Sequence, residues 1–258
     1  AWELFHPTLD DTTIDQSTRI VEIHRPDGKP DLLQQIEHGV LSIVGGYHAM
    51  GRLYRGIQDA TLHQYTHLGD AATMTDNEVF RDANGKALKT LAEAARTGSQ
   101  AEPEINDLPQ LGSRGSADDR WVFTEENAYH ELTTAGALAA ASRALKGFND
   151  PLAADCLRIA RELWTRVKQP ERDTNEGDNP RRPPFPLMRL EAAIELLQTT
   201  GEPEYSDAIK GLDDSIVAQV SRVGWLGARS LALIKDPAYT AKIRQALRGY
   251  RTKVDALE

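Results

Sequence analysis

Four carboxylates lie close in the sequence to two aromatic residues. Asp118, Asp119, Glu125 and Glu126 flank Trp121 and Phe123. A carbohydrate cleft needs this combination, because an aromatic ring stacks on the face of a sugar and carboxylates accept hydrogen bonds from its hydroxyl groups. The same acids also fit the first turn of a helix, where negative side chains interact favourably with the helix dipole. Both interpretations stay open from the residues alone.

Two histidines and nearby acids offer further chemistry. His63 and His67 are four residues apart, with Asp70 close behind. On a helix the two histidines would share one face and could bind zinc. The segment is rich in Gly and Asp and shows no further ligand, which favours loop histidines that hydrogen-bond to backbone or to a sugar. Asp70 and Asp76, near Tyr65, could do general acid–base chemistry, but spacing along a loop does not fix their separation in space.

The composition limits the classes of partner and site. The 258 residues are 40% hydrophobic and 27% charged, which excludes a collagen-like or wholly disordered chain. The formal net charge of −9 disfavours nucleic acid as a partner, because duplex-binding proteins present a basic field. One cysteine excludes an intramolecular disulfide and a multi-cysteine metal site. No apolar stretch reaches the ~18 residues of a membrane-spanning helix, so no membrane partner is expected.

Apolar residues recur at helical spacing along much of the chain. The pattern predicts helices over 31–49, 86–96, 126–148, 151–167, 187–200, 203–220, 225–234 and 237–254. Asp150 and Asp236, each followed by Pro, are strong start signals, and Gly147 and Gly201 are stop signals. Helical hairpins without a strand pattern predict an all-α fold, either an open solenoid or a closed α/α toroid.

Some positions within this pattern carry separate expectations. Cys156 falls on an apolar helical stripe and is expected to be a small core residue. Trp164 and Trp225 also lie on predicted helices and are expected in the core. Residues 50–84 and 97–119 are predicted to be long loops, which favours a cleft at one rim over a smooth scaffold.

Several short segments, taken in order, resemble glycoside hydrolase family 9, the cellulase family, and most closely its Bacteroidetes-type branch. The resemblance spans most of the chain and rests on the segments 31–38 (DLLQQIEH), 65–70 (YTHLGD), 120–126 (RWVFTEE), 131–142 (ELTTAGALAAAS) and 200–205 (TGEPEY). The fourth segment is similar to an Ala-rich helix of the family, and the fifth to its Thr-Gly-Asp-x-x-Tyr turn between helices.

The resemblance implies a single (α/α)6 toroid domain over 1–258 that acts on β-1,4-linked glucans. It also implies an extracellular or periplasmic location, a polysaccharide or oligosaccharide partner, and inversion by an Asp base and a Glu acid. The family's substrate-facing loops correspond to segments that hold five candidate sugar contacts: Tyr65, His67, Asp70, Asp76 and Trp121. No cofactor is expected. Some family members bind structural calcium, for which Glu126 and Glu131 are the nearest acids here, and that possibility stays open.

The catalytic pair itself has no counterpart in this chain. The family's base lies in an Asp-Ala-Gly-Asp motif that is absent from the sequence, and no segment matches the region of the acid. The opening residues resemble the region just downstream of the base motif and have the pattern of a last helical turn before Pro7. We therefore expect a toroid that is incomplete at both ends. The alternative is a non-catalytic α-helical repeat scaffold that binds a protein or peptide.

The missing acid–base pair gives a direct prediction. The isolated 258-residue chain is expected to show no turnover of soluble cellulose derivatives, because neither the base nor the acid of the family is present. Reducing-end assays at high protein concentration check this. Turnover that disappears when one acid of this chain is replaced would contradict the expectation.

Overall fold

The computed structural model of the chain describes residues 2–18, 20–59, 70–74, 78–80, 101–103, 120–124, 126–167 and 185–257. Its contacts divide the chain into two compact units. One unit comprises Ala1–Val44 with Asn127–Glu258, and the other comprises Gly45–Glu126. The helix over residues 31–50 runs through the boundary between them. A single domain over 1–258 stays a prediction.

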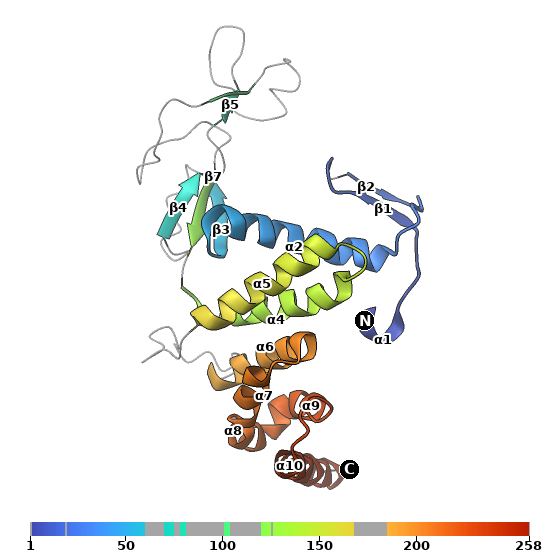
Figure 1. The fold of residues 1–258 in the computed structure, drawn as a ribbon, viewed down its shortest axis with the longest axis vertical. Helices are drawn as coiled ribbons and strands as arrows, with labels where there is room; N and C mark the ends of the chain where they lie inside the picture. The colour runs from blue at the N-terminus through green and yellow to red at the C-terminus, as the bar shows by residue number, and fades with distance from the viewer. Residues whose placement is uncertain are drawn as a thin grey trace. The chain divides into compact units, whose positions relative to one another are not determined.

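Helices predominate in the described residues, which confirms the predicted helical class (Figure 1). They are α1 (Trp2–Phe5), α2 (Asp31–Met50), α4 (Ala128–Leu145), α5 (Asp150–Arg166), α6 (Phe185–Thr200), α7 (Pro203–Lys210), α8 (Asp213–Ala218), α9 (Val220–Ser230) and α10 (Pro237–Asp255). The helix predicted over 203–220 is wrong in one respect, because the chain breaks at Gly211 and Leu212 into α7 and α8. The helix predicted over 86–96 lies outside the described residues.

The residues that were predicted to start and stop helices lie at or next to the observed helix ends. The Asp236 carboxylate accepts hydrogen bonds from the backbone N–H groups of Ala238 and Tyr239, at 2.9 and 3.0 Å, and so caps α10. For α5 the cap is one residue earlier than expected, because the Asn149 side chain accepts from Leu152 N–H. Gly147 and Gly201 follow α4 and α6 with φ values of +82° and +70°, a region that side chains with a Cβ rarely adopt.

The centre of the helical unit is a close contact between α4 and α6. A Cβ added to Gly136 of α4 would lie 3.5 Å from the backbone Cα of Ala192 in α6. Small side chains on both helices therefore let the two backbones approach, as the Ala-rich run of α4 predicts. The helix α5 packs against α4 on another side and buries Cys156 completely. This burial, with the charge of Asp155, raises the pKa of the Cys156 thiol to about 11.

The two tryptophans on helices have different environments. Trp164 is buried, as predicted, with its ring edge against Tyr205 at 5.5 Å between centroids and the Arg189 guanidinium 3.8 Å above its face. The prediction for Trp225 is wrong, because its side chain is 57% exposed. The packed face of α9 carries Gly224 and Gly227 against α8 and α10, and Trp225 lies outside that face.

The described residues also contain short strands, which the sequence pattern did not indicate. Two strands, β1 (Thr12–Asp15) and β2 (Ile20–Ile23), form an antiparallel hairpin. An antiparallel sheet in the order β3–β7–β4 contains β3 (Tyr54–Asp59), β4 (Asp70–Met74) and β7 (Arg120–Thr124), and β5 (Glu78–Phe80) pairs with β6 (Ala101–Pro103). Residues 50–84 were expected to be loop, but β3, β4 and β5 lie within them. Bulges at Tyr54/Gly56 and Ala71/Thr73 interrupt the alternation that would have revealed these strands.

Among the residues that the structure describes, no helix combines the length and apolar character needed to cross a membrane.

One glycine of α9 and one of α2 give a matched test of how α9 packs against α8 and α10. A Cβ at Gly227 would lie 2.9 Å from Ile216 Cγ2 and 3.3 Å from Ile243 Cγ2, whereas a Cβ at Gly39 would meet no atom within 4 Å. We expect Gly227→Ala to lower the free energy of unfolding by about 1–3 kcal/mol through overpacking. Gly39→Ala should raise it by about 0.5–1 kcal/mol, because alanine favours a helix interior over glycine. Urea unfolding of both variants checks the pair, and equal shifts would contradict the packing of α9.

Candidate functional site

The three-stranded sheet holds two of the five candidate sugar contacts. Trp121 is the second residue of the central strand β7 and pairs with Gln58 of β3 and Met74 of β4. Asp70 is the first residue of β4 and pairs with Thr124 at the other end of β7. The structure therefore brings Trp121 and Asp70 onto neighbouring strands, although fifty-one positions separate them in the sequence.

The remaining predicted positions fall elsewhere. Tyr65, His67 and Asp76 lie outside the described residues, and so do His63, Asp118, Asp119 and Glu125. In the sequence, Tyr65 and His67 come shortly before β4, and Asp76 follows its last residue, Met74, by two positions. The five candidate contacts are therefore all on β7, on β4, or a few residues from an end of β4.

Buried and polar contacts fix the end of the central strand. The side chain of Thr124 is 1% exposed, and its hydroxyl accepts a hydrogen bond from Arg52 Nη1 at 3.3 Å. Val122 is also buried, so alternate residues of β7 pack inward. Arg52 Nη2 also lies 4.0 Å from the carboxylate of Glu126, just beyond the strand. Arg52, next to the end of α2, therefore links the helix end to β7 through the Thr124 hydroxyl.

The helix α2 also packs on this sheet through Gly46. A Cβ at Gly46 would lie 3.0 Å from Cδ1 and 3.3 Å from Cε1 of the Tyr54 ring in β3. The helix α2 continues through Gly45 and Gly46 to Met50. Gly46 therefore leaves the space in which the Tyr54 ring lies.

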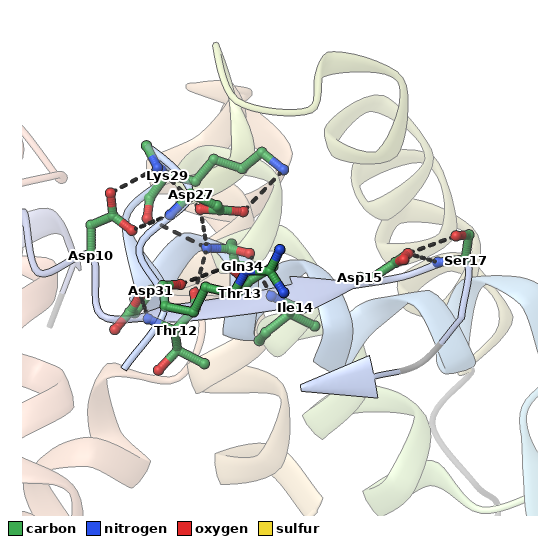
Figure 2. A network of polar contacts seen from close by, with 12 residues as sticks. Asp10, Thr12, Thr13, Ile14, Asp15, Ser17, Asp27, Lys29, Asp31 and Gln34 are labelled. Atoms are coloured by element: carbon green, nitrogen blue, oxygen red, sulfur yellow. Dashed lines mark hydrogen bonds and ion pairs between the residues drawn. The ribbon is translucent and has the colours of Figure 1, made fainter. Parts of the chain in front are cut away.

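A second polar cluster lies at the start of α2 and consists of acids bound to backbone N–H groups (Figure 2). The Asp31 carboxylate accepts from Asp11 N–H and Thr12 N–H at 3.0–3.2 Å, and the Asp10 carboxylate accepts from Asp27 N–H and Gly28 N–H at 2.9 and 2.8 Å. Their oxygens thus hold the loop before α2 in place. Sequence reasoning missed this cluster, although an acid directly after Pro30 is a helix-start signal.

Gln34 joins this loop to the helix. Its side chain is buried, its Oε1 accepts from Ile14 N–H at 3.1 Å, and its Nε2 donates to the Thr12 carbonyl at 3.1 Å (Figure 2). One amide therefore satisfies backbone groups on both sides of Thr13 and sets β1 against the first turns of α2.

The two acids named for calcium, Glu126 and Glu131, differ in their exposure. The Glu126 side chain is 89% exposed, whereas Glu131 is buried in the first turn of α4. Across the described ranges, no group of three or more His, Cys, Asp or Glu side chains is arranged to hold a metal ion.

A third cluster is charged and nearly buried. Arg143 of α4 donates to the Glu195 carboxylate of α6 from Nη2 at 2.6 Å and to the Glu195 carbonyl from Nη1 at 2.9 Å. Arg229 of α9 donates to the other carboxylate oxygen of Glu195. The Glu195 side chain is only 9% exposed, so the two guanidinium groups compensate a buried charge. Sequence periodicity gave no sign of this cluster.

Comparison with known proteins adds the decisive observation. Residues 73–257 match the model of glycosyl hydrolase family 9. The chain belongs to glycoside hydrolase family 9. The match covers well over half of the chain and includes β7, α4 and every helix after it, which confirms the resemblance found in the sequence. The prevalence of helices agrees with the (α/α)6 barrel fold of the family.

Among solved structures, this family 9 chain is similar to a metagenome-derived glycoside hydrolase family 9 endoglucanase. The two share 21% sequence identity with a TM-score of 0.48, over 87% of this chain and 35% of that chain. The chain thus spans about a third of that endoglucanase. No curated protein matches the chain.

The contact of Gly46 with Tyr54 gives a prediction for the sheet of this family 9 chain. We expect Gly46→Ala to lower the free energy of unfolding by about 1 kcal/mol or more, because the new methyl group pushes the Tyr54 ring out of position. Gly45→Ala is the matched control, since a Cβ there meets nothing within 4 Å. The control should gain about 0.5–1 kcal/mol from helix propensity. Thermal and urea unfolding measure both variants, and a stabilised Gly46→Ala variant would contradict the described packing.

Proposed function

We propose that this chain forms part of a glycoside hydrolase that cleaves β-1,4-linked glucans, and that it supplies sugar contacts to the cleft. The observation that carries the proposal is the family 9 match over residues 73–257. Membership implies inverting hydrolysis, in which an Asp activates water and a Glu protonates the leaving oxygen. The two carboxyl groups of such a pair stand ~6.5–9.5 Å apart so that a water molecule fits between them. We assign neither role to a residue of this chain.

Trp121 and Asp70 enter the proposal through the resemblance to family 9. An indole ring can stack on the face of a glucosyl unit, and a carboxylate can accept hydrogen bonds from its hydroxyl groups. Asp70 pairs with Thr124, which follows Trp121 by three residues in β7. At about 3.4 Å per residue, the two positions are roughly 10 Å apart along the strand.

The segments beside β4 complete the proposed contact set. Tyr65 and His67 precede the strand and Asp76 follows it, so all three are near Asp70 in the sequence. Tyr65 and His67 supply aromatic rings with a polar atom, and Asp76 supplies a second acceptor for sugar hydroxyls. We also propose that the protein works outside the cell or in the periplasm, where polymeric glucans are found.

Replacement of Trp121 tests the proposed function. We expect Trp121→Ala to weaken the binding of cellohexaose to this chain by about tenfold, which corresponds to about 1.4 kcal/mol of lost stacking. Trp121→Phe should retain most of the affinity, because a flat aromatic ring remains. Isothermal titration calorimetry measures the dissociation constants.

Trp225→Ala provides the control, because Trp225 is an exposed tryptophan on a different element, α9. It should bind cellohexaose as the unchanged chain does. Equal affinity of Trp121→Ala and the unchanged chain would remove Trp121 from the contact set. No binding of any β-glucan by the unchanged chain would contradict the proposed function and favour the helical scaffold.

A further inference from the structure

The central strand β7 meets an irregular partner on both sides at the same residue. A bulge in β3 lies between Tyr54 and Gly56, and Gly56 pairs with Phe123. A bulge in β4 lies between Ala71 and Thr73, and Ala71 also pairs with Phe123. Each bulge places an extra residue in the neighbouring strand and interrupts the regular hydrogen bonds of the ladder. Near Phe123 the ladder therefore supports the register of β7 less than a regular sheet would.

The register of β7 decides on which face of the sheet the position of Trp121 lies. Successive residues of a strand alternate between the two faces, so a shift of one residue moves every position to the other face. Val122 and Thr124 are both buried, and they share one face because they are two residues apart. The position of Trp121 belongs to the opposite face. A contact that keeps Thr124 on the buried face therefore also fixes the face of Trp121.

Arg52 makes such a contact with the side chain of Thr124. Arg52 Nη1 donates to Thr124 Oγ1 at 3.3 Å, and the Thr124 side chain is only 1% exposed. A hydrogen bond from a charged donor is stronger than one between neutral groups. A shift of one residue would put Phe123 or Glu125 in this buried place. Phe123 offers no acceptor, and Glu125 would have to bury a carboxylate, so the bond favours the observed register.

The backbone on either side of Arg52 fixes the point from which its side chain extends. Gly51 follows the end of α2 with a φ of +66°, a conformation that favours glycine. Leu53, directly after Arg52, is buried. The chain then enters β3 at Tyr54, which pairs with Thr124. Arg52 therefore reaches Thr124 from an anchored backbone, at the end of β7 where β3 and β7 already lie side by side.

The second contact of Arg52 is looser. Its Nη2 lies 4.0 Å from Glu126 Oε1, and the Glu126 side chain is 89% exposed. An exposed ion pair of this kind contributes little free energy. The Thr124 hydroxyl, and not the Glu126 carboxylate, is therefore the acceptor through which Arg52 acts on β7.

We propose that Arg52 is a positioning residue that fixes the register of β7 through the Thr124 hydroxyl and so keeps Trp121 on its sugar-binding face. The fixing of the register rests on the contacts described above, and its use in sugar binding rests on the proposed function. Without the bond, β7 exchanges between two registers, of which one presents Trp121 to the glucan. The apparent dissociation constant then rises as the fraction of chains in the competent register falls.

Two substitutions of Thr124 in the full chain test the proposal. Thr124→Val removes the hydroxyl and keeps the shape of the side chain, whereas Thr124→Ser keeps the hydroxyl and removes a methyl group. We expect Thr124→Val to raise the Kd of cellohexaose about fivefold, the size of effect expected for one hydrogen bond. It should also add a second NMR resonance of the Trp121 indole N–H, which the spectrum of Trp121→Phe identifies. Thr124→Ser should match the unchanged chain in both measurements.

Substitutions of Arg52 and Glu126 test the donor side of the contact. Arg52→Ala should reproduce the effects of Thr124→Val, and the double variant should bind no more weakly than either single one, because all three lack the same bond. Glu126→Gln is the matched control. It removes the exposed ion pair and keeps the bond to Thr124, so the affinity and the single Trp121 resonance should stay unchanged.

Three results would overturn the proposal. The first is a single, unshifted Trp121 resonance in Thr124→Val. The second is a Trp121 resonance at its position in a disordered peptide, because the hydroxyl would then only stabilise the sheet. The third is an equal effect of Thr124→Val and Thr124→Ser, because the hydroxyl would then not be the decisive group.

The proposed function and the role of Arg52 fail in different ways. If the unchanged chain binds no β-glucan, the proposed function is wrong and the role of Arg52 in sugar binding falls with it. The Trp121 resonances still decide whether Arg52 fixes the register. If the unchanged chain binds cellohexaose and Thr124→Val binds it equally tightly, only the positioning role of Arg52 is wrong.

Discussion

The close approach of α4 and α6 is the constraint on which the helical part of this chain depends. Gly136 and Ala192 leave so little between the two backbones that a hydroxyl on α6, that of Thr199, reaches a carbonyl of α4. Arg143 and Glu195, further along the two helices, are 13% and 9% exposed. Charges so poorly exposed need partners within the protein. The packing of small residues and the buried ion cluster are therefore two parts of one arrangement.

The sheet has a different basis. Its central strand is short and depends on inward-facing Val122 and Thr124, with Arg52 bonded to the Thr124 hydroxyl. The chain passes from the end of β7 into α4 within a few residues, where Asn127 caps the helix. Trp121 thus lies on an element whose C-terminal end is fixed by a hydrogen bond and followed at once by a capped helix.

The sequence was informative wherever a local rule decides the structure. The cap at Asp236, the stops at Gly147 and Gly201, and the burial of Cys156 all follow from side-chain chemistry within a few residues. The sheet could not be foreseen in the same way, because bulges and glycines disrupt the alternation in β3 and β4. Trp225 was misjudged because the glycines of α9, not its largest side chain, form the packed face.

The sequence offered individual candidate residues for the site, but it could not predict how they are placed relative to one another in space. The segments that resemble family 9 offered Asp70 and Trp121 as candidates, but no spacing rule predicts that strand pairing places two such residues on neighbouring strands. The ion cluster is the extreme case, because Arg143, Glu195 and Arg229 come from three helices. Long-range pairing of charges depends on tertiary structure, and hydrophobic periodicity contains no information about it.

The single cysteine has a consequence for following this molecule in solution. Its thiol is fully buried on α5, and its raised pKa leaves almost no reactive thiolate at neutral pH. Because Cys156 is the only sulfhydryl in the chain, every alkylation event reports a moment when that helix pair has opened. The rate of Cys156 alkylation, followed by mass spectrometry, therefore measures how often the core opens transiently, and no label has to be added to the protein.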